Sequence, residues 1–114
     1  MNEVRRDRKF LLSLELHREI ARLLREDPER VRQLGLEGVS RVRPNARSLG
    51  AHQRIDAWRS MLERRDWEAL SARLIGEDEE SAEMRNMTVF LRVVPDARRR
   101  EIIEEVTSRP GLLV

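Results

Sequence analysis

The chain has 114 residues, 39% hydrophobic and 39% charged, with a net charge of +2 and no cysteine. This length allows one domain, and a charged fraction well above the usual quarter favours a helical fold with a strongly solvated surface over a strand-rich fold. The composition excludes disulfides, thiolate metal sites and a cysteine nucleophile, and the two isolated histidines argue against a histidine metal cluster.

The sequence carries no sign of a membrane or secreted protein. No apolar run approaches the roughly 18 to 20 residues that cross a bilayer, and the first residues lack a small-residue cleavage site. We therefore expect a cytoplasmic protein that does not insert into a membrane.

The charges are distributed unevenly along the chain. Residues 1–65 hold 16 basic and 10 acidic side chains, whereas residues 66–114 hold 7 and 11. Arginine makes bidentate contacts with carboxylates and phosphates, so an acid-free cluster of arginines is a candidate binding site for a phosphate or an acidic partner. The segment 38–55 contains such a cluster, formed by Arg41, Arg43, Arg47 and Arg54.

The first predicted helix spans about residues 6–26. At 100° per residue its apolar side chains cover an arc about 200° wide, whereas a stripe of roughly 100° is enough to cover one side of a core. Burial between two neighbouring helices explains this width, and so does contact with a partner or with a second copy of the chain. The candidate partner-binding side chains are Phe10, Leu12, Leu16, Ile20 and Leu23.

A second, short helix is predicted to begin at Asp27 and Pro28, because aspartate caps helices and proline suits their first position. We expect it to run to Leu34 and to end at Gly35. The following segment, 35–48, contains two glycines and one proline and has no apolar period. It is therefore predicted to be an accessible basic loop.

The next two predicted helices each carry a tryptophan. One spans about 49–65 and has Trp58 on its apolar face. The other is capped by Asp66, carries Trp67 and ends at Gly76. Both tryptophans are most simply explained as core residues.

The last part of the chain, residues 78–107, is predicted to contain two helices and one segment with an ambiguous pattern. Helices are indicated over 78–86, by acidic residues near the start, and over 95–107, by the proline at the start. The segment 87–94 is rich in β-branched residues, but no partner strand exists elsewhere in the chain. We interpret it as a helical turn capped by Thr88.

These elements predict an all-α protein of five or six helices in a single domain, 1–114. We divide this domain into four parts: an N-terminal helical arm at 1–34, a basic loop at 35–48, a helical core at 49–107 and a tail at 108–114.

No residue pattern in the sequence indicates catalysis. The chain has no glycine-rich phosphate loop, no GxSxG, no HExxH and no EF-hand pattern, and its carboxylates alternate with arginines as in surface ion pairs. His17 lies within the apolar arc of the first helix, which is typical of a core or interface histidine. We therefore predict no catalytic residue, no metal ligand and no cofactor.

Several stretches of the sequence share a pattern with one family. The first is DRKFLLSLELHREIARLL at 7–24, followed by Asp27 and Pro28. The others are the apolar helix faces with Trp58 and Leu62 and with Leu70 and Leu74, the stretch EDEESAEMRNMTVF at 77–90, and an arginine-bearing helix that ends at Ile102 and Ile103. This pattern resembles a family of small actinobacterial proteins that are encoded beside nucleotidyltransferase-type toxins and serve as antitoxins. The chain departs from the family at Val89, where a proline of a Ser-Pro-Phe-like turn is expected.

The resemblance implies that the chain binds and neutralises a toxin of the nucleotidyltransferase type. The first helix would supply the buried anchor, and the basic loop would cover an active site built of metal-binding carboxylates that binds nucleotide phosphate. Two other classes stay open: a small helical DNA-binding regulator that uses 38–55 on the phosphate backbone, and a structural subunit or adaptor. Binding dominated by phosphates weakens steeply with salt, which separates the DNA-binding class from a protein interface.

Overall fold

The computed structural model describes residues 7–109. These residues form six α-helices and one short 3₁₀ helix and contain no strand, which confirms the predicted all-α fold. The elements are α1 (Arg8–Glu26), α2 (Pro28–Val42), η1 (Arg43–Asn45), α3 (Leu49–Arg64), α4 (Trp67–Ile75), α5 (Glu79–Asn86) and α6 (Asp96–Thr107).

Side-chain caps explain where the five α-helices α1 to α5 begin. In each case the residue before the helix accepts a hydrogen bond from a backbone N–H of the first turn. These residues are Asp7, Asp27, Ser48, Asp66 and Asp78. Such a cap contributes about 1 kcal/mol, because it satisfies a donor that the helix itself leaves unpaired. The start of α6 differs, since Pro95 occupies the cap position and provides no side-chain acceptor.

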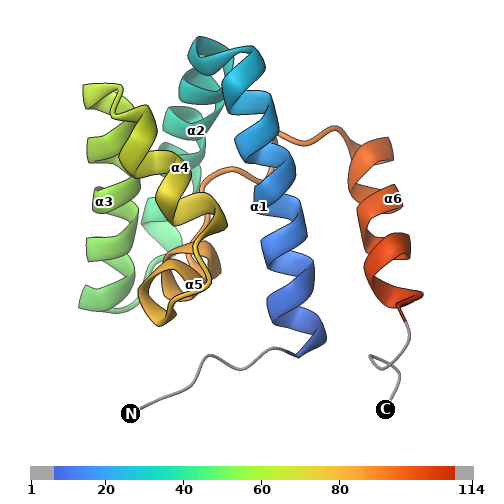
Figure 1. Ribbon diagram of the computed structural model, residues 1–114. Helices are drawn as coiled ribbons and strands as arrows, with labels where there is room; N and C mark the ends of the chain where they lie inside the picture. The colour runs from blue at the N-terminus through green and yellow to red at the C-terminus, as the bar shows by residue number, and fades with distance from the viewer. Residues whose placement is uncertain (1–6, 110–114) are drawn as a thin grey trace.

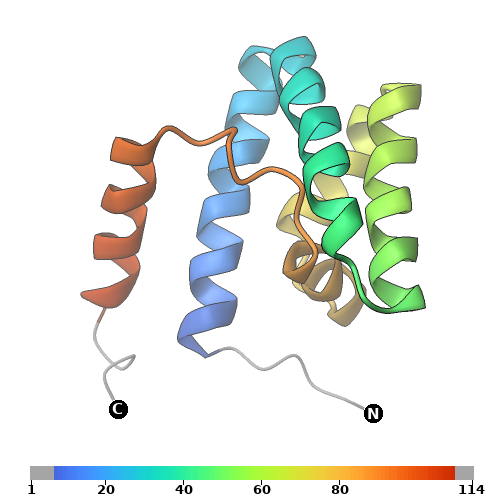
Figure 2. The same cartoon turned by 180° about the vertical axis from the view of Figure 1, so that it is seen from behind.

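Helix α1 is the central element of the fold (Figure 1). Helices α2, α4 and α5 pack against it, α3 lies outside α2 and α4, and α6 lies along the opposite side of α1 (Figures 1 and 2). The segment 87–95 carries the chain from α5 past α1 and α2 to α6, and Figure 2 shows it in front of these helices. Because α1 has helices on two sides, its wide apolar arc is used within the chain.

The core is organised around Trp58 of α3. This side chain is fully buried, and its ring packs edge to face on Phe90 with 5.0 Å between the centroids. Its indole Nε1–H donates to the backbone oxygen of Met84 at 3.0 Å. Trp58 therefore connects α3 to α5 and to the 87–95 segment, as a core residue should.

The basic loop predicted at 35–48 is wrong over its first half. Helix α2 continues to Val42, and Gly35 and Gly38 lie inside it and are buried. The buried positions Val31, Gly35, Gly38 and Val39 follow the helical period, because here glycine serves as a packing residue and not as a terminator. The connection between α2 and α3 shrinks to 43–48, half of which is η1.

The helical turn predicted at 87–94 is confirmed only as a single turn at 90–93. Residues 87–95 contain no helix, although the hydroxyl of Thr88 accepts a hydrogen bond from the backbone N–H of Phe90, and Val93 N–H closes a turn onto the Phe90 oxygen. Four side chains of this segment are buried, which explains its β-branched composition without a strand: Val89, Phe90, Val93 and Val94. The parts of the predicted arm and tail at 1–6 and 110–114 lie outside the described residues.

Candidate functional site

The apolar side chains of α1 that we expected to bind a partner lie largely inside the protein. Phe10 and Ile20 are 8% and 2% exposed, so a partner could contact them only if the neighbouring helices moved. Leu12, Leu16 and Leu23 are half-buried and pack against the core. The alternative explanation of the wide arc, burial between neighbouring helices, is confirmed.

Helix α6 covers the side of α1 that carries the three half-buried leucines. Arg98 of α6 forms an ion pair with the buried Glu19 of α1, with 3.6 Å between Nε and Oε1. At 100° per residue, Leu12, Leu16 and Leu23 fall on the same side of α1 as Glu19. A partner that bound these leucines would therefore have to displace α6.

Two of the four arginines predicted as one basic site pair with carboxylates of the protein itself. Arg43 forms an ion pair with Asp56, and this contact lowers the pKa of that carboxyl group below its usual value. Arg54 lies 3.9 Å from the carboxylate of Glu83. Arg41 and Arg47 have no ion pair within residues 7–109, and Arg41 lines a pocket. Two of the four positive charges are thus compensated by acids of α3 and α5.

Arg41 belongs instead to a different group of side chains. The end of α2, the 87–95 segment and the start of α6 enclose a pocket of about 600 Å³, which we call the arginine pocket. Its lining residues are Arg41, Leu91, Arg92, Val94, Pro95, Asp96 and Arg99. Arg92 was not expected at a site, because a single arginine inside an apolar segment gives no signal in the sequence. Only the packing of 87–95 on α2 brings it near Arg41.

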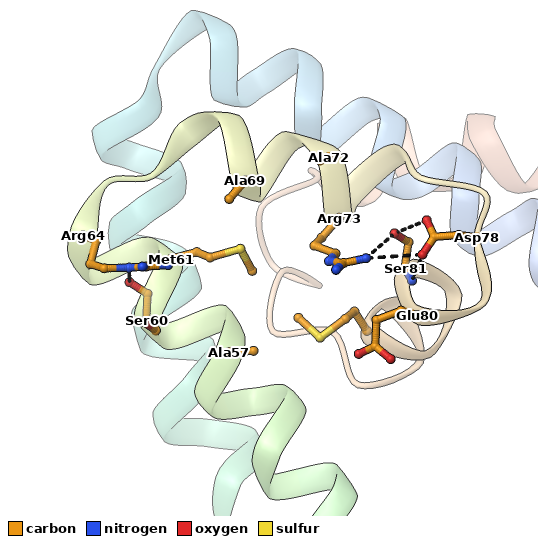
Figure 3. A pocket seen from close by; sticks show the side chains of 11 residues that line it. Ala57, Ser60, Met61, Arg64, Ala69, Ala72, Arg73, Asp78, Glu80 and Ser81 are labelled. Atoms are coloured by element: carbon orange, nitrogen blue, oxygen red, sulfur yellow. Dashed lines mark hydrogen bonds and ion pairs between the residues drawn. The ribbon is translucent and has the colours of Figure 1, made fainter.

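A second, apolar pocket of about 700 Å³ lies between α3, α4 and α5 (Figure 3). Met61 and Met84, both nearly buried, contribute to its lining together with three alanines of α3 and α4. On one side Ser81 donates its hydroxyl to Asp78 at 2.6 Å, and Arg73 donates to the other oxygen of Asp78 at 3.3 Å. The hydroxyl bond is the main reason that the pKa of Asp78 is lowered. This network caps α5, so these polar groups serve the fold.

His17 is a buried structural histidine, as its place in the apolar arc suggested. Its Nδ1 lies 2.7 Å from the backbone oxygen of Ser13, to which it must donate. Its Nε2 lies 2.7 Å from the hydroxyl of Thr88 and accepts a hydrogen bond from it. Burial lowers the pKa of His17 from 6.5 to about 4. The neutral ring therefore ties α1 to the 87–95 segment at neutral pH.

This burial predicts a pH-dependent stability. Between pH 6.5 and pH 4 the unfolded chain binds a proton at His17 that the folded chain does not, so stability falls as the pH falls. The free energy of unfolding should decrease by about 2 kcal/mol between pH 7 and pH 5. Urea unfolding at these two pH values measures it, with His17→Gln as the control. A decrease of the same size in the variant would contradict this assignment.

Arg85 is the second buried polar side chain of this region. It is 2% exposed, donates from Nη1 to the backbone oxygen of Gly76 at 2.5 Å, and lies 5.6 Å from the centroid of the Phe10 ring. Burial lowers its pKa, and within residues 7–109 its Nε and Nη2 have no hydrogen-bond partner. Its contacts stabilise the carboxyl end of α4, where backbone carbonyls attract a positive charge.

Residues 7–109 contain neither a cluster of metal ligands nor a membrane-spanning helix. No three side chains of histidine, aspartate or glutamate come together there in a way that could hold a metal ion, and no helix of this part is long and apolar enough to cross a membrane. No protein-family model, curated protein or solved structure matches the chain.

Proposed function

We propose that the chain is an antitoxin-like binding protein that attaches to an acidic site of a partner enzyme through the arginine pocket. The observation that carries the proposal is the combination of Leu91, which is 50% exposed, with Arg41 and Arg92, which have no carboxylate partner within residues 7–109. An exposed leucine that lines the same pocket as two unpaired arginines suits a surface that another protein covers.

The chemistry of these side chains favours a carboxylate-rich partner. Guanidinium groups bind carboxylates in a bidentate way, and arginine is enriched among the residues that dominate binding energies. Arg41 and Arg92 have no intramolecular ion pair to lose when a partner binds. Leu91 would supply the apolar contact that excludes water from these pairs.

The family resemblance makes a nucleotidyltransferase-type toxin the first partner to test. Such an enzyme would present metal-binding carboxylates and a nucleotide phosphate site, both of which attract guanidinium groups. Compared with the expectation from the sequence, the set of arginines changes. Arg41 stays and Arg92 is added, while Arg43 and Arg54 are left out because they already pair with Asp56 and Glu83. Arg99 lines the same pocket but pairs with Asp96.

Charge reversal tests this proposal. The double variant Arg41→Glu with Arg92→Glu should weaken binding to the enzyme encoded beside this chain at least about 100-fold, because two attractive contacts become repulsive. The control is Arg47→Glu, which reverses an exposed arginine outside the pocket and should change the dissociation constant about twofold or less. Calorimetric titration measures both, after circular dichroism has verified helix content. Equal affinities of the double variant and the control would overturn the proposal.

A small helical DNA-binding regulator is the alternative. It is favoured by the unpaired arginines themselves, since guanidinium groups also contact phosphates of the DNA backbone. In that case the affinity for a duplex should fall steeply between 50 and 200 mM salt, by roughly tenfold or more for each few phosphates contacted. Binding to a protein partner through Leu91 should change far less over the same range.

A further inference from the structure

We infer that the arginine pocket also binds a small phosphate ester and that this ligand competes with the acidic partner. The competition with an acidic partner rests on the proposed function, whereas the binding of the phosphate ester does not. Three arginines from three separate elements line the pocket: Arg41 from α2, Arg92 from the 87–95 segment and Arg99 from α6.

The charge balance of the pocket calls for an anion. Asp96 is the one carboxylate among its lining residues, and it lies 2.5 Å from Nη2 of Arg99. This pair leaves two positive charges, at Arg41 and Arg92, without a carboxylate partner within residues 7–109. A phosphate monoester carries close to two negative charges at neutral pH and three acceptor oxygens, which matches two guanidinium groups in both respects.

The start of α6 adds donors at the same place. Pro95 and Asp96 line the pocket, and Pro95 provides no side chain to cap the first turn of α6. The first N–H groups of a helix bind anions when they are not capped, and the helix dipole favours negative charge there. This feature supports the arginines and does not replace them.

The apolar wall of the pocket defines the rest of the ligand. Leu91, Val94 and Pro95 are the apolar residues of the lining, and a volume of about 600 Å³ is typical of sites for small organic molecules. Inorganic phosphate alone would leave most of this space to water. The pocket therefore fits a phosphate ester with an organic body of nucleotide or sugar size.

Titrations of the full chain alone, followed by NMR, test this inference. AMP and ribose 5-phosphate are the probes, and adenosine is the control without a phosphate. We expect saturable shifts of the backbone amides of Leu91 and Arg92 with both phosphate esters and none with adenosine. A tighter complex with AMP assigns a nucleotide as the source of the phosphate, whereas equal affinities assign the phosphate group itself as the recognised element, and both results support the inference.

Three variants make the titration specific. Arg41→Gln and Arg92→Gln should each weaken AMP binding about tenfold, and Arg47→Gln should leave it unchanged within about twofold. The inference is overturned if no saturable shift appears, if adenosine binds equally well, or if Arg47→Gln weakens binding as much as the pocket variants. It is also overturned if a DNA duplex binds more tightly than AMP and shifts Arg47 together with the pocket. Because no partner is present, failure here leaves the proposed function to its own charge-reversal test.

Discussion

Replacement of Gly38 by alanine is expected to lower the free energy of unfolding by at least about 2 kcal/mol. An alanine Cβ at this position would lie 1.9 Å from the backbone oxygen of Val89. The atom in conflict belongs to the backbone, so α2 and the 87–95 segment have to move apart, at a cost at the upper end of the range for overpacking, about 3 kcal/mol or more. The gain of about 1 kcal/mol that alanine brings inside a helix is smaller than this cost when the whole segment shifts.

Gly50 provides a matched control for this variant. An alanine Cβ there would meet the end of the flexible Arg54 side chain at 3.0 Å and no backbone atom within 4 Å among those nearest. Gly50→Ala should leave the stability unchanged or raise it by up to about 1 kcal/mol. Urea unfolding of both variants measures the difference. If Gly38→Ala were as stable as Gly50→Ala, the close approach of α2 and Val89 would be wrong.

Replacement of Trp58 by alanine is expected to have the largest effect of all, a loss of about 3 to 5 kcal/mol. The side chain is fully buried, packs edge to face on Phe90, and donates to the backbone oxygen of Met84. Since small domains are stable by only about 5 to 15 kcal/mol, this variant is close to the limit of folding. Denaturant unfolding followed by circular dichroism gives the value.

A milder variant keeps this prediction testable if the alanine variant does not fold. Trp58→Phe retains a ring against Phe90 but leaves the Met84 oxygen without its donor, which should cost about 1 to 3 kcal/mol. Trp67 is the control, because it is partly exposed and packs at the edge of the core. Trp67→Phe should cost clearly less. Equal losses at the two positions would contradict the central role of Trp58.

Helix caps and the helical period of apolar residues were sufficient to predict most of the fold. Asp27 and Asp66 cap the helices that the sequence placed after them, and Trp58 lies in the core as its helical face suggested. These features depend on neighbours within one or two turns, so the sequence alone contains them. The all-α fold follows from such features, and none of them requires knowledge of distant contacts.

The errors arose where packing between distant segments decides the structure. Gly35 and Gly38 look like helix breakers, yet they lie within α2 because Phe90 and Val89 approach the helix too closely for a side chain. The buried run at 87–94 has no partner strand and forms an irregular core segment that contains a single turn.

The candidate site was predicted least well, for the same reason. Arg41 and Arg92 are 51 positions apart in the sequence, and nothing near either of them indicates the other. The ion pairs of Arg43 with Asp56 and of Arg54 with Glu83 were equally invisible, since they join separate helices. The wide apolar arc of α1 allowed two explanations, and the position of α6 decides between them.

The central claim is that the arginine pocket binds a protein partner, and a pull-down of the tagged full chain from its native host tests it most directly. The experiment is done at roughly 0.3 M salt, where exposed charges are strongly screened. We predict that the wild type and Arg47→Glu each recover a stoichiometric nucleotidyltransferase-type enzyme, identified by mass spectrometry, and that Arg41→Glu with Arg92→Glu does not. Recovery of the chain alone, with nucleic acid appearing in the 260/280 nm absorbance ratio only when the salt is lowered, would contradict the claim.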